Sequence, residues 1–267
     1  MKGILRAIGY FILYFLLTFF FQLLMSMGLM AIGAASGLQD EKLLIKFANN
    51  NLLGMTVVSG ILTAFVLFLI FKVRRKDVKQ EWKLNQFTMK SVLLACFASF
   101  SFSFLFTFFT YDLPMENSIM ISESAAYYSD LCPVLGYILM ALNLLIVAPA
   151  AEEIALRGIV YTRVEKTANA VAAIAVSSVL FGLMHFSAGG IALVIGAMLM
   201  AVVFGYIFYQ FDSLWVCIIA HAAANLPDFI LYDHPAIPNG MLLGLKIFFA
   251  CAFAAGIFAI SKLEKGN

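Results

Sequence analysis

Long apolar runs alternate with short polar breaks along the whole chain. A membrane-spanning helix needs about 20 consecutive, mostly apolar residues. Counting runs of that kind predicts an all-α, polytopic transmembrane bundle with about eight spans. Their expected positions are 7–34, 52–71, 89–110, 132–150 (or onward to 162), 168–186, 189–210, 213–232 and 240–260.

The charges in the polar breaks predict how this bundle is oriented. The third break, residues 111–130, contains acidic residues but no Lys or Arg, whereas the second break is strongly basic. Cationic loops stay on the cytoplasmic side of a membrane. With eight spans, both termini and the second, fourth and sixth loops are therefore expected in the cytoplasm. The second-break cations are Lys72, Arg74, Arg75, Lys76, Lys79, Lys83 and Lys90.

Three apolar runs have further patterns. Residues 97–104 alternate Phe with Ala or Ser, which is typical of a strand. A single strand would leave its backbone unsatisfied in lipid, so we expect a Phe-rich helix. Ala197, Ala201 and Gly205 recur every four residues and predict a close helix contact. The first run far exceeds the roughly 7–15 apolar residues of a signal peptide and is expected to be a retained span.

Composition supports the membrane assignment and excludes other classes. Hydrophobic residues make up 63% of the 267, and charged residues only 12%, against about 25% charged in soluble domains. The four cysteines are widely separated, which indicates neither a disulfide framework nor a thiolate metal site. No basic patch is interleaved with aromatic residues, so we expect no nucleic-acid partner. The oligomeric state stays open.

Three charges stand in the fourth apolar run: Glu152, Glu153 and Arg157. Each charge at bilayer depth costs about 2.5–3.5 kcal/mol on insertion scales. On a helix, Glu153 and Arg157 share a face at i, i+4 and can pair, while Glu152 points about 100° away. This spacing suggests one structural and one chemical carboxylate, with ordinary interfacial charges at a helix end as the alternative. Pro149, just upstream, is predicted to bend the helix.

Two histidines and an asparagine add polar groups to later apolar runs. His185 ends the segment FGLMH, and His221 and Asn225 share a helix face in HAAAN. Helical rise places Glu152 and His221 at similar depths, roughly 16 and 13 Å above the nearest cytoplasmic charges. His185 is expected higher, unless its span is tilted or begins outside the membrane.

The segments EEIALR, FGLMH and HAAAN, in this order, resemble the motifs of the CAAX prenyl protease and bacteriocin-processing family (CPBP, also called Abi) of intramembrane endopeptidases. The resemblance covers Leu135 to Asn225. It suggests a single membrane domain with two parts: residues 1–130, holding three spans and their loops, and residues 131–267, a catalytic helical core. A multi-pass protein of the plasma membrane, in a bacterium, is the expected setting.

The resemblance implies hydrolysis of a peptide bond within or near the bilayer. The substrate would be a membrane-associated peptide: a CAAX-like prenylated peptide, a bacteriocin leader or a signalling peptide. We hypothesise that Glu152, aided by His185, activates a water, because a carboxylate in an apolar cavity is more basic than one in water. Asn225 and His221 would donate to the oxyanion. Glu153 would pair with Arg157 or share the role of base.

A metal and two rival functions stay open. Glu152, His185 and His221 could hold Zn²⁺ with one free position, as an alternative to a metal-independent glutamate protease. The first rival is a non-catalytic immunity or scaffold protein of the same fold. The second is a transporter with a Glu–His proton relay, although no inverted repeat supports it.

Overall fold

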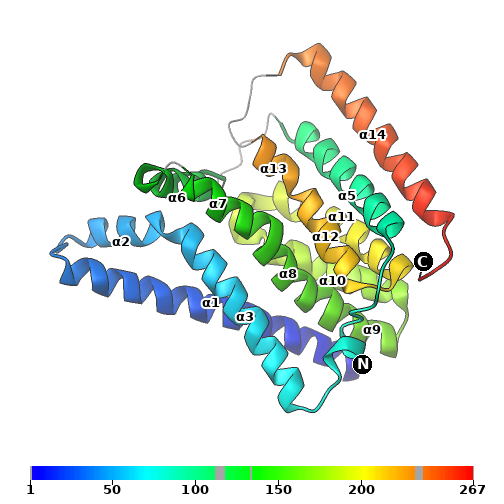
Figure 1. Cartoon of the computed structure of the whole chain (residues 1–267), viewed down its shortest axis with the longest axis horizontal. Helices are drawn as coiled ribbons and strands as arrows, with labels where there is room; N and C mark the ends of the chain where they lie inside the picture. Colours follow the sequence, from blue (N-terminus) through cyan, green and yellow to red (C-terminus); the bar gives the residue numbers. More distant parts are fainter. Residues whose placement is uncertain (1, 112–117, 133, 232–236, 267) are drawn as a thin grey trace.

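The computed structural model describes residues 2–111, 118–132, 134–231 and 237–266, and all regular elements within them are helices (Figure 1). The helices long and apolar enough to cross a membrane are Gly3–Ala35, Leu52–Val73, Met89–Phe109, Leu135–Thr167, Gly190–Phe211 and Asn239–Ser261. Two shorter apolar helical stretches, Ala170–Met184 and Leu214–Ile230, cover the other two predicted runs. By helix composition the chain is a multi-pass membrane protein.

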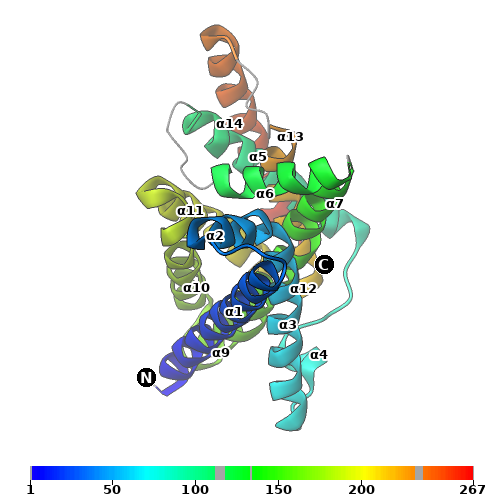
Figure 2. The same cartoon turned by 90° about the vertical axis from the view of Figure 1, so that its left-hand side faces the viewer.

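The N-terminal helices α1 (Lys2–Ala35) and α3 (Leu52–Val73) pack against each other and against the helix that carries the two glutamates (Figure 2). Between them lies the short helix α2 (Glu41–Asn50), and the third polar break contains a further helix, α6 (Ser118–Leu131). The Ser124 hydroxyl joins α6 to the start of α3, because it accepts from the Leu53 N–H at 3.0 Å. Both short helices lie in segments that the apolar pattern treats as loops.

Two π-helical segments interrupt the α-helical winding of the motif-bearing helix Leu135–Thr167. It consists of α7 (Leu135–Leu142), the π-helical segment η1 (Asn143–Val147), α8 (Ala148–Glu153), the π-helical segment η2 (Ile154–Tyr161) and α9 (Thr162–Thr167). In η1 the Ala148 N–H donates to the carbonyl of Asn143, five residues back. Pro149 follows and has no N–H to give. The disturbance predicted at Pro149 therefore takes the form of a widened turn, which is frequent at functional sites.

Four of the remaining helices contact this long one: α10 (Ala170–Met184) and α11 (Phe186–Phe211), which form a hairpin, and then α12 (Leu214–Ala224) and α13 (Leu226–Ile230). On the other side of α12 lies α5 (Met89–Phe109), and α14 (Asn239–Ser261) packs against α5. The Phe–Ser alternation lies in α5, so the prediction of a helix is confirmed. Phe104 of α5 stacks on Phe249 of α14 with centroids 4.7 Å apart, and α5 and α14 run side by side (Figure 1). Gly205 of α11 lies against Ile174 of α10, as the small-residue pattern predicts.

One end of the bundle, which we call the Lys83 end, is cross-linked by charge. The Lys83 ammonium lies 2.6 Å from Glu165 and 2.8 Å from Asp212. Its segment, which begins with α4 (Val78–Glu81), also accepts the Leu214 N–H through the Lys83 carbonyl at 2.9 Å. The predicted second, fourth and sixth breaks therefore meet at one end.

Both ends of the chain lie at the Lys83 end as well. Near the N-terminus, Gly3 packs so closely against Thr167 that a side chain on residue 3 would clash with it. Near the C-terminus, the Leu263 carbonyl accepts from the Gln210 side chain at 2.7 Å. This arrangement is the one that the charge pattern predicts for an even number of crossings.

Candidate active site

Glu153 is the centre of a buried polar cluster in the middle of the bundle. Its carboxylate is fully buried, and its Oε1 accepts from Arg157 Nη1 at 3.0 Å. The ion pair predicted from the i, i+4 spacing is confirmed. The same oxygen accepts from His221 Nδ1 at 2.9 Å, a third member of the cluster that the helix spacing could not reveal.

Arg157 is held in the core by groups from two other helices, α10 and α11. Its side chain is fully buried, and its Nη2 donates to the Ala201 carbonyl at 2.8 Å. The guanidinium carbon lies 5.3 and 5.4 Å from the ring centres of Phe181 and Phe204, within the range of cation–π attraction. An unpaired buried charge is very costly. Glu153 and these partners together offset the cost of burying the Arg157 guanidinium in an apolar core.

His221 lies between the two glutamates. A carboxylate only accepts hydrogen bonds, so the proton of the bond to Glu153 is on Nδ1 of His221. The imidazole stacks on Phe204 with centroids 4.6 Å apart. Its other nitrogen, Nε2, lies 3.8 Å from Glu152 Oε2, too far for a direct hydrogen bond. The Glu152 side chain is 16% exposed whereas that of Glu153 is at 0%, so only Glu152 offers its carboxylate to an accessible space.

His185 lies one helical turn beyond this cluster. It caps the C-terminus of α10, and its Nδ1 is 2.8 Å from the Phe181 carbonyl. Its ring is 4.8 Å from the Phe181 ring, which in turn is 5.7 Å from that of His221. In the described part of the chain, no hydrogen bond or ion pair joins His185 to Glu152. His185 therefore contacts the cluster through the Phe181 ring, and its depth in the membrane stays a prediction.

Asn225 lies at the C-terminal end of α12 and faces the widened turn of the motif-bearing helix. Its side-chain Nδ2 donates to the Leu144 carbonyl at 2.8 Å. In the π-helical register, that carbonyl would pair with the N–H of residue 149, which is a proline. Asn225 therefore satisfies the acceptor that Pro149 leaves without a donor, and its second N–H remains for another partner.

Tyr14 of α1 is a further neighbour of the cluster. It is buried, and its phenol interacts electrostatically with Glu152 and with Glu153. Sequence reasoning did not single out this residue, because a tyrosine in an apolar run has no spacing that marks it.

The proposed zinc ligands do not converge. Among the described residues, no group of three or more His, Cys, Asp or Glu side chains lies close enough together to hold a metal ion. Glu152 and His221 approach each other, but the Nδ1 of His185 is engaged by the Phe181 carbonyl. The described donor set therefore does not fit Zn²⁺.

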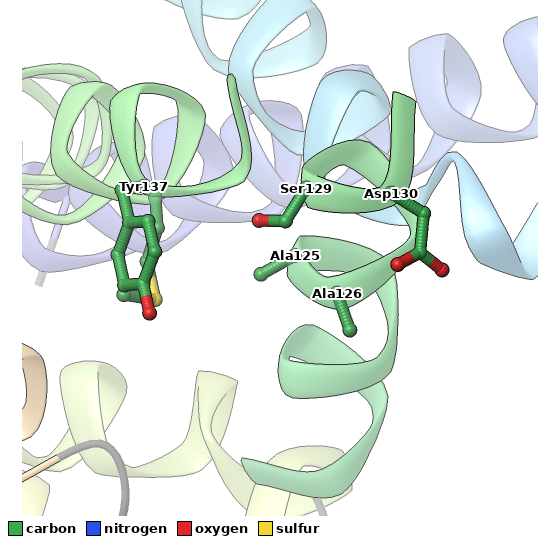
Figure 3. Close-up of a pocket in the computed structure, with 6 residues that line it drawn as sticks. Ala125, Ala126, Ser129, Asp130 and Tyr137 are labelled. Carbon is green, nitrogen blue, oxygen red and sulfur yellow. The ribbon is translucent and has the colours of Figure 1, made fainter. Parts of the chain in front are cut away.

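A separate hollow lies between α6 and α7. It has a volume of about 220 Å³ and is lined by Ala125, Ala126, Ser129, Asp130, Tyr137 and Met140 (Figure 3). None of the candidate site residues lines it, so we do not assign it to the site.

The fold and the site together define a multi-pass helical membrane protein with a buried glutamate–arginine–histidine cluster in its core. Residues 134–227, which contain every candidate site residue, match the family described as Rce1-like, type II CAAX prenyl endopeptidase. Residues 134–227 are thus an Rce1-like domain, and the family it resembles is one of proteases. No curated protein and no solved structure matches the chain.

Proposed function

We propose that the chain is an intramembrane endopeptidase that hydrolyses a peptide bond of a membrane-associated peptide or protein. The observation that carries this proposal is the place of His221, held by the buried Glu153 and facing the accessible Glu152. A fixed imidazole beside a carboxylate that can be reached is suited to position and deprotonate a water. The match of residues 134–227 to a family of endopeptidases supports a peptide bond as the target of this water.

Glu152 is the general base in this mechanism. A water that bonds both Glu152 Oε2 and His221 Nε2 would lie beside the 3.8 Å gap between these atoms. The water oxygen attacks the scissile carbonyl carbon while its proton passes to Glu152. When the tetrahedral intermediate collapses, the C–N bond breaks and the same proton goes to the leaving nitrogen.

The hydrogen-bond pattern supports a change in two assigned roles. With its proton on Nδ1, a neutral His221 presents a lone pair at Nε2, which favours holding the water over donating to an oxyanion. The second N–H of Asn225 can still donate to the oxyanion. His185, with Nδ1 on the Phe181 carbonyl, has Nε2 left for the substrate.

We place the Lys83 end, with both termini, in the cytoplasm of a cell whose plasma membrane holds the protein. Cys132, exposed between α6 and α7, then faces outward. A membrane-impermeant maleimide should label it on intact cells, and Cys132→Ser is the control for the label. Labelling only after lysis would contradict this orientation.

The substrate class is a peptide anchored in or at the membrane: a CAAX-like prenylated peptide, or a bacteriocin or signal peptide undergoing processing. Identifying it calls for the Glu152→Gln variant, which keeps the shape of the site but removes the base. Peptides retained by this variant in native membranes, and cleaved by the wild-type chain in proteoliposomes, are identified by mass spectrometry.

The same assay tests the mechanism. Glu152→Gln should abolish turnover with little loss of thermal stability, because the closest described partner of its carboxylate is 3.8 Å away. Glu153→Gln should lose turnover and also about 3–5 kcal/mol of stability, since it leaves Arg157 buried and uncompensated. Glu41→Gln, at the exposed start of α2, is the matched control. Full turnover by Glu152→Gln would refute the role of base and favour a non-catalytic scaffold of the same fold.

A further inference from the structure

A basic hollow lies at the Lys83 end, where α5 begins and α14 ends. It has a volume of about 460 Å³ and is lined by Thr88, Lys90, Lys262, Leu263 and Glu264. Lys90 is at the N-terminus of α5, and Lys262 follows the C-terminus of α14. Because the two helices are antiparallel, these two termini adjoin. Lys262 lies over the Phe258 ring at 4.9 Å, and within the described residues neither lysine forms an ion pair.

The segment after α14, which forms one wall of this hollow, is held in place by contacts with the end of α11. The Gln210 side chain donates to the Leu263 carbonyl at 2.7 Å, and the Gln210 carbonyl accepts from the Gly266 N–H at 2.7 Å. The Lys265 ammonium lies 4.1 Å from the centre of the Tyr209 ring. Residues 263–266 are thus anchored to the end of α11, and in the lining of the hollow two lysines outnumber the single carboxylate of Glu264.

Below the lysines, the surface of both helices is apolar and exposed. On α5, Leu93 and Phe97 follow Lys90 at i+3 and i+7, so the three share one face. On α14, Phe258 precedes Lys262 by one turn and is 63% exposed. A cationic hollow above an apolar, exposed strip matches a molecule with an anionic head and hydrocarbon chains.

We propose that this hollow binds the phosphate of an anionic membrane lipid, whose acyl chains lie along Leu93, Phe97 and Phe258. Basic pockets between membrane helices bind anionic headgroups, because the lysine charges act in a region of reduced dielectric close to the lipid phosphates. A free phosphate ester has the same head chemistry, but it would use only the cationic part of this surface. The lipid uses both parts.

The test measures lipid retention by the full chain, purified in detergent and titrated with phosphatidylglycerol or phosphatidylcholine, by native mass spectrometry. The double variant Lys90→Gln/Lys262→Gln should lose roughly thirtyfold in phosphatidylglycerol affinity, about fivefold for each lysine. Glu264→Gln should bind more tightly, which keeps the test informative if the double variant does not fold. Phosphatidylcholine should be bound weakly by all variants.

The matched control is Lys42→Gln/Lys46→Gln, which removes the same charge from the exposed face of α2 and should leave the affinity unchanged. Equal losses in the two double variants would overturn the proposal, since the effect would then be one of net charge. Competition by inorganic phosphate as effective as that by phosphatidylglycerol would identify a free-phosphate site and overturn the lipid assignment. Phe258→Ala should weaken only the lipid.

Discussion

Asn225 and Pro149 are expected to be energetically coupled, although they belong to different helices. The Leu144 carbonyl is in the widened turn η1 and receives its hydrogen bond from Asn225. Replacing Asn225 by Ala leaves this carbonyl without a donor in a bundle interior where water is scarce. Replacing Pro149 by Ala restores a backbone N–H that can take over the bond. The loss at Asn225 should therefore be smaller when residue 149 is alanine.

The size of the effect follows from the cost of a buried, unsatisfied polar group, about 1–3 kcal/mol. In the Pro149 background, Asn225→Ala should cost that amount. In the Pro149→Ala background it should cost less than about half as much, because the carbonyl has a replacement donor. For a chain of this size each kcal/mol corresponds to roughly 2–4 °C in melting temperature.

The assay is a double-mutant cycle read by thermal unfolding in detergent, with tryptophan fluorescence as the signal, since Trp82 is buried in the fold. Independent sites add within about 0.3–0.5 kcal/mol. Additivity within that range would refute the reasoning, because it would mean that the Leu144 carbonyl gains nothing from a backbone donor at residue 149. Asn225→Asp is a useful companion, since it removes the donor at nearly constant volume.

Three further predictions follow from the packing and charges of the bundle. Gly182→Ala should destabilise the chain by about 1–3 kcal/mol, because a Cβ would clash with Met198 in the α10–α11 hairpin; Gly9→Ala, which meets nothing within 4 Å, should be neutral, and equal melting temperatures would contradict this. Burial alone would lower the pKa of Lys83, but its bonds to Asp212 and Glu165 outweigh burial and raise that pKa above the ordinary 10.5. Stability from these bonds is present below pH 10.5 and lost as pH rises through the raised pKa, so the wild-type melting temperature should fall more steeply in that range than that of Lys83→Met; parallel curves would contradict it. Arg157→Lys should lose stability in the same unfolding assay, because an ammonium cannot reach both Glu153 and the Ala201 carbonyl in a fixed fork, and an unchanged melting temperature would argue against that geometry.

Much of the fold could be predicted from the sequence, because burial in lipid makes the hydrophobic pattern nearly continuous. Within the described residues all eight apolar runs are helical, and the charged breaks that the pattern groups on one side meet at Lys83. The helices α2 and α6 were missed, since short helices in polar breaks depend on tertiary contacts such as the Ser124 bonds. The number of membrane crossings and the side that faces the cytoplasm remain predictions.

In the candidate site, contacts within one helix could be predicted from the sequence, and contacts between distant segments could not. The Glu153–Arg157 pair could be predicted because it is local to one helix. The contacts of His221 with Glu153, and of Asn225 with Leu144, join residues far apart in the chain and have no local signal. The two π-helical segments were not predicted either, because reading faces from a sequence assumes 3.6 residues per turn throughout.

The Glu153–Arg157 pair has a consequence for how the chain enters the membrane during synthesis. The Ala201 carbonyl that Arg157 binds lies 44 residues further along, which at about 5–20 residues per second means a delay of roughly 2–9 s. During that delay the motif-bearing helix must pass through the translocon without its later partners. A carboxylate and a guanidinium one turn apart compensate each other within the nascent helix. The spacing therefore serves biogenesis as well as the finished site.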